Sequence, residues 1–176
     1  MSVFNSNPAL ELLESKEEWY LAKKLLYTNW LENKNELDNL LRLGTECWYI
    51  MSYWEQLKVN NLERSDISSA LTEVKQYGKL HFSNSETFLW IFGYMIKLFP
   101  YWFDDFSGDL EGFENLGRDM IIRSLEINPN NEIAKMLCSP DDSPQYIHSC
   151  SKVKMDLNQY FPGNSAIEQY FRGVWS

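Results

Sequence analysis

The stretch F-L-W-I-F-G-Y-M-I-K-L-F, residues 88–99, contains eleven uncharged residues and a single charged one, Lys97. Ser83 and Glu86 have the spacing of an N-terminal capping box, and Pro100 stops a helix from continuing. These signals predict one helix of about four turns. Because it has almost no polar face, we expect it to be buried on most sides, at the centre of an all-helical fold. A bilayer span needs about 20 apolar residues, so the stretch is too short to cross a membrane.

Composition narrows the class of protein. A chain of 176 residues is expected to form one domain, residues 1–176, with a core that needs no disulfide or metal. A net charge of −9 disfavours nucleic acid and anionic membranes and favours a basic protein partner. The chain opens without a signal-peptide pattern and has three cysteines, an odd number, so we expect a reducing, cytoplasmic location.

Apolar residues recur at helical spacing along the whole chain, and nowhere does a sustained alternation predict a strand. Asn7-Pro8 and Ser15 with Glu18 predict two helix starts, and Ser65-Asp66 predicts a third. We expect an all-α fold of about seven to nine helices, stacked as antiparallel hairpins, either TPR-like or an irregular bundle. Beyond the central helix and the short one at Pro8, the expected helices are 16–32, 36–58, one beginning near 65, 110–127, 132–137, 144–160 and 165–174.

One part of the chain resembles a tetratricopeptide repeat. Gly117, Ile121, Ser124 and Pro129 have the spacing of its second helix, and Phe92-Gly93-x-x-Ile96 has the pattern of its first helix. Gly93 and Pro129 are 36 residues apart, which exceeds the repeat's own spacing, so residues 99–109 would be an insertion. Leu43-Gly44-x-x-Cys47 matches the same first-helix pattern more weakly. The resemblance implies stacked helical hairpins and, as one functional alternative, an adaptor that binds a protein or peptide in a groove.

The chain as a whole is similar to bacterial immunity proteins of the contact-dependent-inhibition and colicin types. The similarity rests on its small size, acidic charge and degenerate helical repeats, and on the C-terminal segment N-Q-Y-F-P-G-N-S-A-I-E-Q-Y-F-R-G-V-W. It implies a protein without catalytic activity that neutralises a cognate toxin, often a nuclease. It assigns no residue roles.

Acidic and aromatic residues are concentrated directly after the central stretch. Between Tyr101 and Met120 there are six carboxylates and one arginine, which accounts for −5 of the net charge. A protein that blocks a basic nuclease site needs carboxylates and aromatic anchors, so this segment is the expected partner-binding surface. Its expected contact residues are Tyr101, Trp102, Asp104, Asp105, Asp109, Glu111 and Glu114. The alternative is a solvated loop leading into a helix N-terminus, where acidic residues are favoured in any case.

The sequence was also compared with the patterns of metal, phosphate-binding and Cys–His catalytic sites. A calcium loop counted from Asp105 puts Leu110 where glycine is required. Cys138, His148 and Cys150 match no usual zinc spacing, and no phosphate-binding glycine loop occurs, so we expect no metal and no cofactor. Gly93 and Gly117 are better explained by close helix crossing than by a ligand, and Cys47 by a place in the core. A helical enzyme with an unrecognised Cys–His site remains a second alternative.

Five C-terminal aromatics allow two interpretations. They form either a second exposed patch or a cap over the last hydrophobic face of the stack, and the cap is the expectation. The five residues are Tyr160, Phe161, Tyr170, Phe171 and Trp175.

Overall fold

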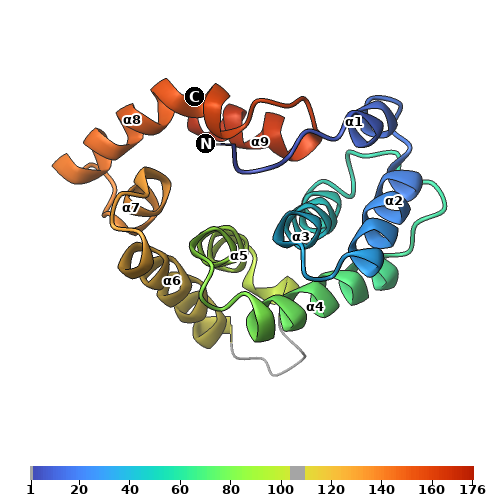
Figure 1. Ribbon diagram of the computed structural model, residues 1–176, viewed down its shortest axis with the longest axis horizontal. Coiled ribbons are helices and arrows are strands. Elements are labelled where there is room, and N and C mark those ends of the chain that lie inside the picture. Colours follow the sequence, from blue (N-terminus) through green and yellow to red (C-terminus); the bar gives the residue numbers. More distant parts are fainter. Residues whose placement is uncertain (1, 104–109) are drawn as a thin grey trace. The chain divides into compact units, whose positions relative to one another are not determined.

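The computed structural model describes residues 2–103 and 110–176, and these residues fold as an all-helical protein (Figure 1). The described residues contain nine α-helices, one short 3₁₀ turn (η1) and no strand, which confirms the expected fold class. The elements are α1 (Pro8–Ser15), α2 (Trp19–Glu32), α3 (Leu37–Ser52), α4 (Arg64–His81), α5 (Glu86–Leu98), η1 (Pro100–Trp102), α6 (Leu110–Ile127), α7 (Glu132–Cys138), α8 (Pro144–Tyr160) and α9 (Ala166–Trp175).

The helices fall into two compact units. One consists of residues 1–81, 158–174 and 176, and the other of residues 82–157 and 175. In the first unit, α1 packs on α2, α2 on α3, and α3 on α4, as consecutive hairpins (Figure 1). In the second, α5 packs on α6 and α6 on α7. These pairings follow the general tendency of consecutive elements to lie next to each other in space.

The central stretch is a helix, and it is buried as the sequence predicts. All nine residues from Phe88 to Ile96 are buried, and Pro100 begins the 3₁₀ turn that follows. The cap differs from the prediction: the side chain of Ser85, not Ser83, accepts a hydrogen bond from the Phe88 N–H at 3.3 Å. Each large apolar side chain buried in this way contributes about 1.5–3 kcal/mol to folding.

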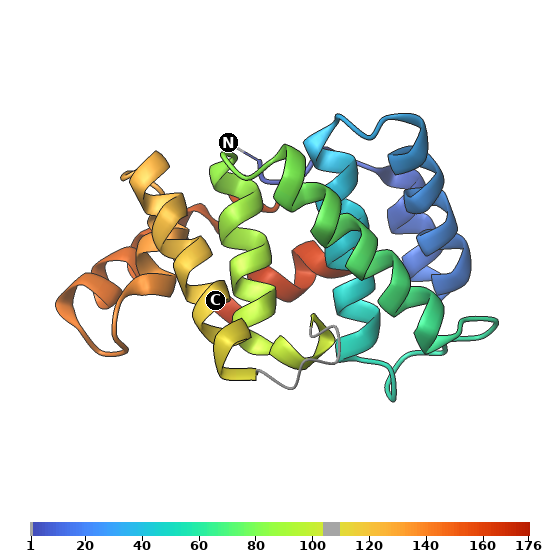
Figure 2. The ribbon, with the colours of Figure 1, turned by 90° about the horizontal axis from the view of Figure 1, so that it is seen from below.

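Two glycines set the closeness of α5 and α6, which share the most extensive interface of any helix pair described (Figure 2). A Cβ built on Gly93 would lie 2.7 Å from the Gly117 carbonyl oxygen, and one built on Gly117 would lie 2.7 Å from the Lys97 nitrogen. No side chain fits at such distances from backbone atoms. The prediction of close helix crossing is therefore confirmed. Gly117, Ile121 and Ser124 of α6 are buried, whereas Leu116 is 37 % exposed.

Hydrogen bonds tie the start of α5 to its neighbours in the same unit. The Ser124 hydroxyl donates to the Glu86 carbonyl oxygen at 3.0 Å, and the Asn131 side-chain amide donates to the Glu86 carboxylate. Asn131 also caps α7 by accepting from the Ala134 N–H at 3.0 Å. These contacts hold α6 and α7 against one end of the buried helix.

Two helix boundaries predicted from sequence are wrong. Ser15 does not cap α2; it is the last residue of α1, and the chain then turns through Glu17, whose φ is 58°. That left-handed conformation interrupts the helix, so α2 begins only at Trp19. The predicted helix 36–58 also ends early, at Ser52, and residues 53–56 form turns.

Candidate functional site

The predicted partner-binding surface is only partly described. Asp104, Asp105 and Asp109 lie outside the described residues. The described members are Tyr101 and Trp102 of η1 and Glu111 and Glu114 of α6, and we add Asp119, an exposed carboxylate further along α6. We call these five residues the α6 patch.

The aromatic part of the α6 patch is held by the turn η1, which packs against both α5 and α6. The rings of Phe99 and Trp102 stack with their centroids 4.2 Å apart, and Tyr101 meets Trp102 edge to face at 5.3 Å. Phe103 is fully buried and lies 6.4 Å from Phe92 in the core. Tyr101 is 53 % exposed. Phe103 thus anchors the turn in the core, Phe99 and Trp102 form a stacked pair, and the ring of Tyr101 is exposed to solvent.

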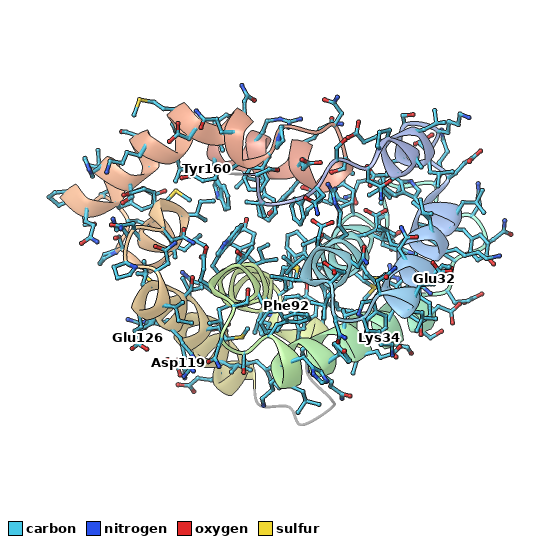
Figure 3. All side chains as sticks on the ribbon, in the orientation of Figure 1. Glu32, Lys34, Phe92, Asp119, Glu126 and Tyr160 are labelled. Carbon is cyan, nitrogen blue, oxygen red and sulfur yellow. The ribbon has the colours of Figure 1, made fainter. Side chains whose placement is uncertain are left out.

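The acidic part of the α6 patch is on the solvent side of α6. Glu111, Glu114 and Asp119 are exposed, and Figure 3 shows Asp119 and Glu126 on the side of α6 that faces away from α5. Within the described part of the chain, no lysine or arginine lies within ion-pair distance of these three carboxylates. Their charges are therefore not neutralised by the described cations of the chain.

The structure also contains a set of buried charged residues that were not predicted from the sequence. Glu14 on α1, Arg42 and Glu46 on α3, and Glu168 on α9 are each less than 7 % exposed. We call these four residues the Arg42 cluster; all belong to the first compact unit. Sequence reasoning missed them because Arg42 and Glu46, four residues apart on α3, have the usual spacing of a solvated surface pair.

Arg42 is the only cation of the cluster. Its Nη1 lies 3.4 Å from Glu168 Oε2 and donates to Ser165 Oγ at 3.2 Å. Its Nη2 donates to the Asn5 carbonyl oxygen, and its guanidinium lies 4.8 Å from the centre of the Phe4 ring. One side chain thereby joins the N-terminal segment, α3 and the start of α9.

The start of α9 supplies the remaining hydrogen bonds to the acids. Ser165 caps the helix and donates to Glu168 Oε2 at 2.6 Å, and the Gly163 N–H donates to Glu168 Oε1 at 2.9 Å. The Ala166 N–H donates to Glu14 Oε2. Ser165-x-x-Glu168 has capping-box spacing, which is the one sequence signal for this arrangement.

Glu14 and Glu46 form a buried acid pair in which the pKa of both carboxyl groups is raised. Burial raises the pKa of Glu46 well above its ordinary value, and the charge of Glu14 raises it further, against a smaller opposing effect of Arg42. Burial also raises the pKa of Glu14, although the Ala166 N–H and Glu46 oppose that rise. No N–H or described hydroxyl donates to either oxygen of Glu46 or to Glu14 Oε1. Burial and the neighbouring Glu14 carboxylate therefore favour the protonated form of Glu46.

A pocket of about 450 Å³ opens beside this pair, within the same unit. We call it the α1–α9 pocket. Its wall combines two carboxylates with three aromatic rings and several polar groups. The lining residues are Glu11, Glu14, Ser15, Trp19, Tyr49, Asn164, Ala166, Gln169 and Tyr170.

The cysteines and the C-terminal aromatic residues, which the sequence offered as further candidates, form no additional site among the described residues. Burial raises the pKa of the Cys47 thiol to about 12, which fits its expected core role. Cys138 and Cys150 are free thiols, and no cluster of three His, Cys, Asp or Glu side chains in the described ranges could hold a metal ion. Of the C-terminal aromatics, Phe161, Phe171 and Trp175 are buried, so they do not form an exposed patch.

Comparison of the chain with protein-family models, with curated proteins and with solved structures gives no match. None of the described helices combines the length and the apolar character that crossing a membrane requires.

Proposed function

We propose that the protein is a cytoplasmic immunity protein that binds a basic toxin domain, a nuclease in the first instance, and blocks it through the α6 patch. The observation that carries the proposal is the pairing of an exposed aromatic turn with uncompensated carboxylates. Tyr101 projects from a turn anchored by Phe103, and Glu111 and Glu114 are exposed on α6 without an ion-pair partner among the described residues.

The chemistry of the patch favours a basic protein. Aromatic anchors contribute most of the affinity in protein interfaces, and a preformed stack loses little conformational freedom on binding. Carboxylates that have no partner in the free protein gain more from a lysine or arginine of the partner than those already paired. A nuclease site offers such cations because it holds phosphates. We extend the surface to Asp104, Asp105 and Asp109 on the basis of the sequence. Blocking a site in this way needs no catalytic group.

The proposal is tested by protection in cells. The neighbouring reading frame is searched for a candidate toxin domain, the chain is coexpressed with that candidate, and survival is scored. Changing Asp104, Asp105 and Asp109 to Lys, or Glu111 and Glu114 to Lys together with Tyr101→Ala, is expected to abolish protection while the melting temperature stays close to that of the wild type. Glu126→Lys, an exposed change on the same helix, is the matched control and should still protect. Full protection by both multiple variants would refute the proposal.

A further inference from the structure

The α1–α9 pocket has a net negative wall. Glu11 and Glu14 both line it, and a Cβ built on Gly163 would lie 2.9 Å from Glu11 Oε1 and 2.4 Å from Glu168 Oε2. Glu11 therefore approaches the Arg42 cluster from the pocket side. Only one arginine faces the four carboxylates gathered here, and it is already engaged by Glu168. The site is short of positive charge.

A buried polar group at the pocket is left without a donor. Glu14 is 6 % exposed, and its Oε1 accepts no hydrogen bond from any N–H or hydroxyl of the described residues. The two oxygens of the neighbouring Glu46 likewise accept no hydrogen bond among the described residues. A buried acid pair that lacks donors is costly, and any cation that reaches it competes with a proton.

Three aromatic residues, Trp19, Tyr49 and Tyr170, also line the pocket. The rings of Trp19 and Tyr49 have centroids 5.9 Å apart, and those of Tyr49 and Tyr170 are 6.4 Å apart. Faces of Trp and Tyr attract ammonium and guanidinium groups, whereas hard metal ions prefer a full shell of oxygen ligands. The side chains of Asn164 and Gln169 add polar groups at the pocket.

We propose that the α1–α9 pocket binds an organic cation of the guanidinium or alkylammonium class. Glu14 and Glu11 pair with the cationic group, and the three rings enclose its alkyl part. Two sources offer this chemistry: a free small amine or guanidine, and a basic side chain of a polypeptide. The site lies in a different unit from the α6 patch, and the proposal does not depend on toxin binding.

The groups that face the pair set the pH dependence of binding. They are Glu11 from α1, Arg42 and Tyr49 from α3, and Glu168 and Tyr170 from α9. Burial raises the pKa of both Glu14 and Glu46, so a cation competes with a proton for this pair and binding strengthens as the pH rises.

The test is a calorimetric and NMR titration of the full chain with butylguanidine, using butylurea as the uncharged analogue of the same shape. We expect saturable binding of butylguanidine with a dissociation constant on the order of 1 mM or tighter, and none of butylurea. Glu14→Gln keeps the acceptor for the Ala166 N–H and removes the charge, so it should fold and weaken binding at least tenfold. Glu11→Gln should weaken it several-fold. The charge-matched control Glu36→Gln, at an exposed position, should leave it unchanged.

A second arm identifies the source of the cation. Arginine capped at both ends as its acetyl amide represents a polypeptide side chain, and butylguanidine represents a free ligand. Binding of either compound that depends on Glu14 supports the proposal, and their relative affinities tell which source the pocket prefers. Equal shifts with butylguanidine and butylurea, or affinity for butylguanidine that Glu14→Gln leaves intact, would overturn it, as would the absence of saturation by both cations.

Discussion

Replacing Arg42 by Met removes the only cation of the Arg42 cluster while keeping a long apolar side chain in its place. Arg42 is 2 % exposed and Glu168 is 1 % exposed, so solvent cannot replace the lost partner. Breaking a buried ion pair by removing one member costs about 3–5 kcal/mol, because the remaining charge is left uncompensated. For a domain of this size that loss lowers the melting temperature by about 6–20 °C.

The assay is urea unfolding followed by tryptophan fluorescence, with the slope of unfolding free energy against urea checked for constancy. Lys58→Met is the control, since Lys58 and Glu17 form an exposed pair whose loss should cost about 1 kcal/mol or less. In a double variant, Arg42→Met with Glu168→Gln, the combined loss should be smaller than the sum of the single losses by about 0.5–3 kcal/mol. A cost for Arg42→Met no larger than that of the control would refute the assignment of the cluster as a structural tie.

Two further predictions concern the acid pair and the helix crossing. Because the folded-state pKa of Glu46 is raised above 4.5, its contribution to stability is complete below pH 4.5 and is lost as the pH rises through the folded-state value. Glu46→Gln should therefore gain stability relative to the wild type by up to about 1.4 kcal/mol per pH unit above 4.5, and parallel stability curves in urea titrations at pH 4 to 8 would contradict this. Gly117→Ala should destabilise by about 1–3 kcal/mol because its Cβ meets the backbone of Lys97, whereas Gly173→Ala, with nothing within 4 Å, should be neutral or slightly stabilising in thermal unfolding. Equal melting temperatures for these two variants would show that the crossing is not tight.

The apolar periodicity of the sequence was sufficient to predict the all-helical fold. The apolar run at residues 88–96 leaves almost no polar face, so burial on most sides was expected, and the structure confirms that these nine residues are buried. Gly93 and Gly117 were correctly assigned to helix packing because glycine in a helix interior is costly without a reason. Helix starts were less predictable: Ser83 and Ser85 both offer a capping hydroxyl, and the choice depends on the turn that precedes the helix.

The buried charges could not be predicted from local patterns. Arg42 and Glu46 have helical spacing that is identical to that of a surface pair, and Glu14 and Glu168 lie more than 100 residues apart in sequence. Only tertiary packing of α1, α3 and α9 brings them together. The predicted partner-binding residues were easier to place than the buried charges, because the exposure of Tyr101, Glu111 and Glu114 follows from their local polarity. Their proposed function, in contrast, depends on a second molecule.

The most direct measurement of the proposed binding through the α6 patch is the association rate of the chain with a basic toxin domain that it protects against, taken as a function of salt. We expect the rate to fall at least tenfold between low and physiological ionic strength, and the Glu111→Lys/Glu114→Lys variant to associate slowly at every salt concentration. Glu126→Lys should retain the salt dependence of the wild type. A rate that is indifferent to salt, or identical for the wild type and the double variant, would contradict binding through the α6 patch.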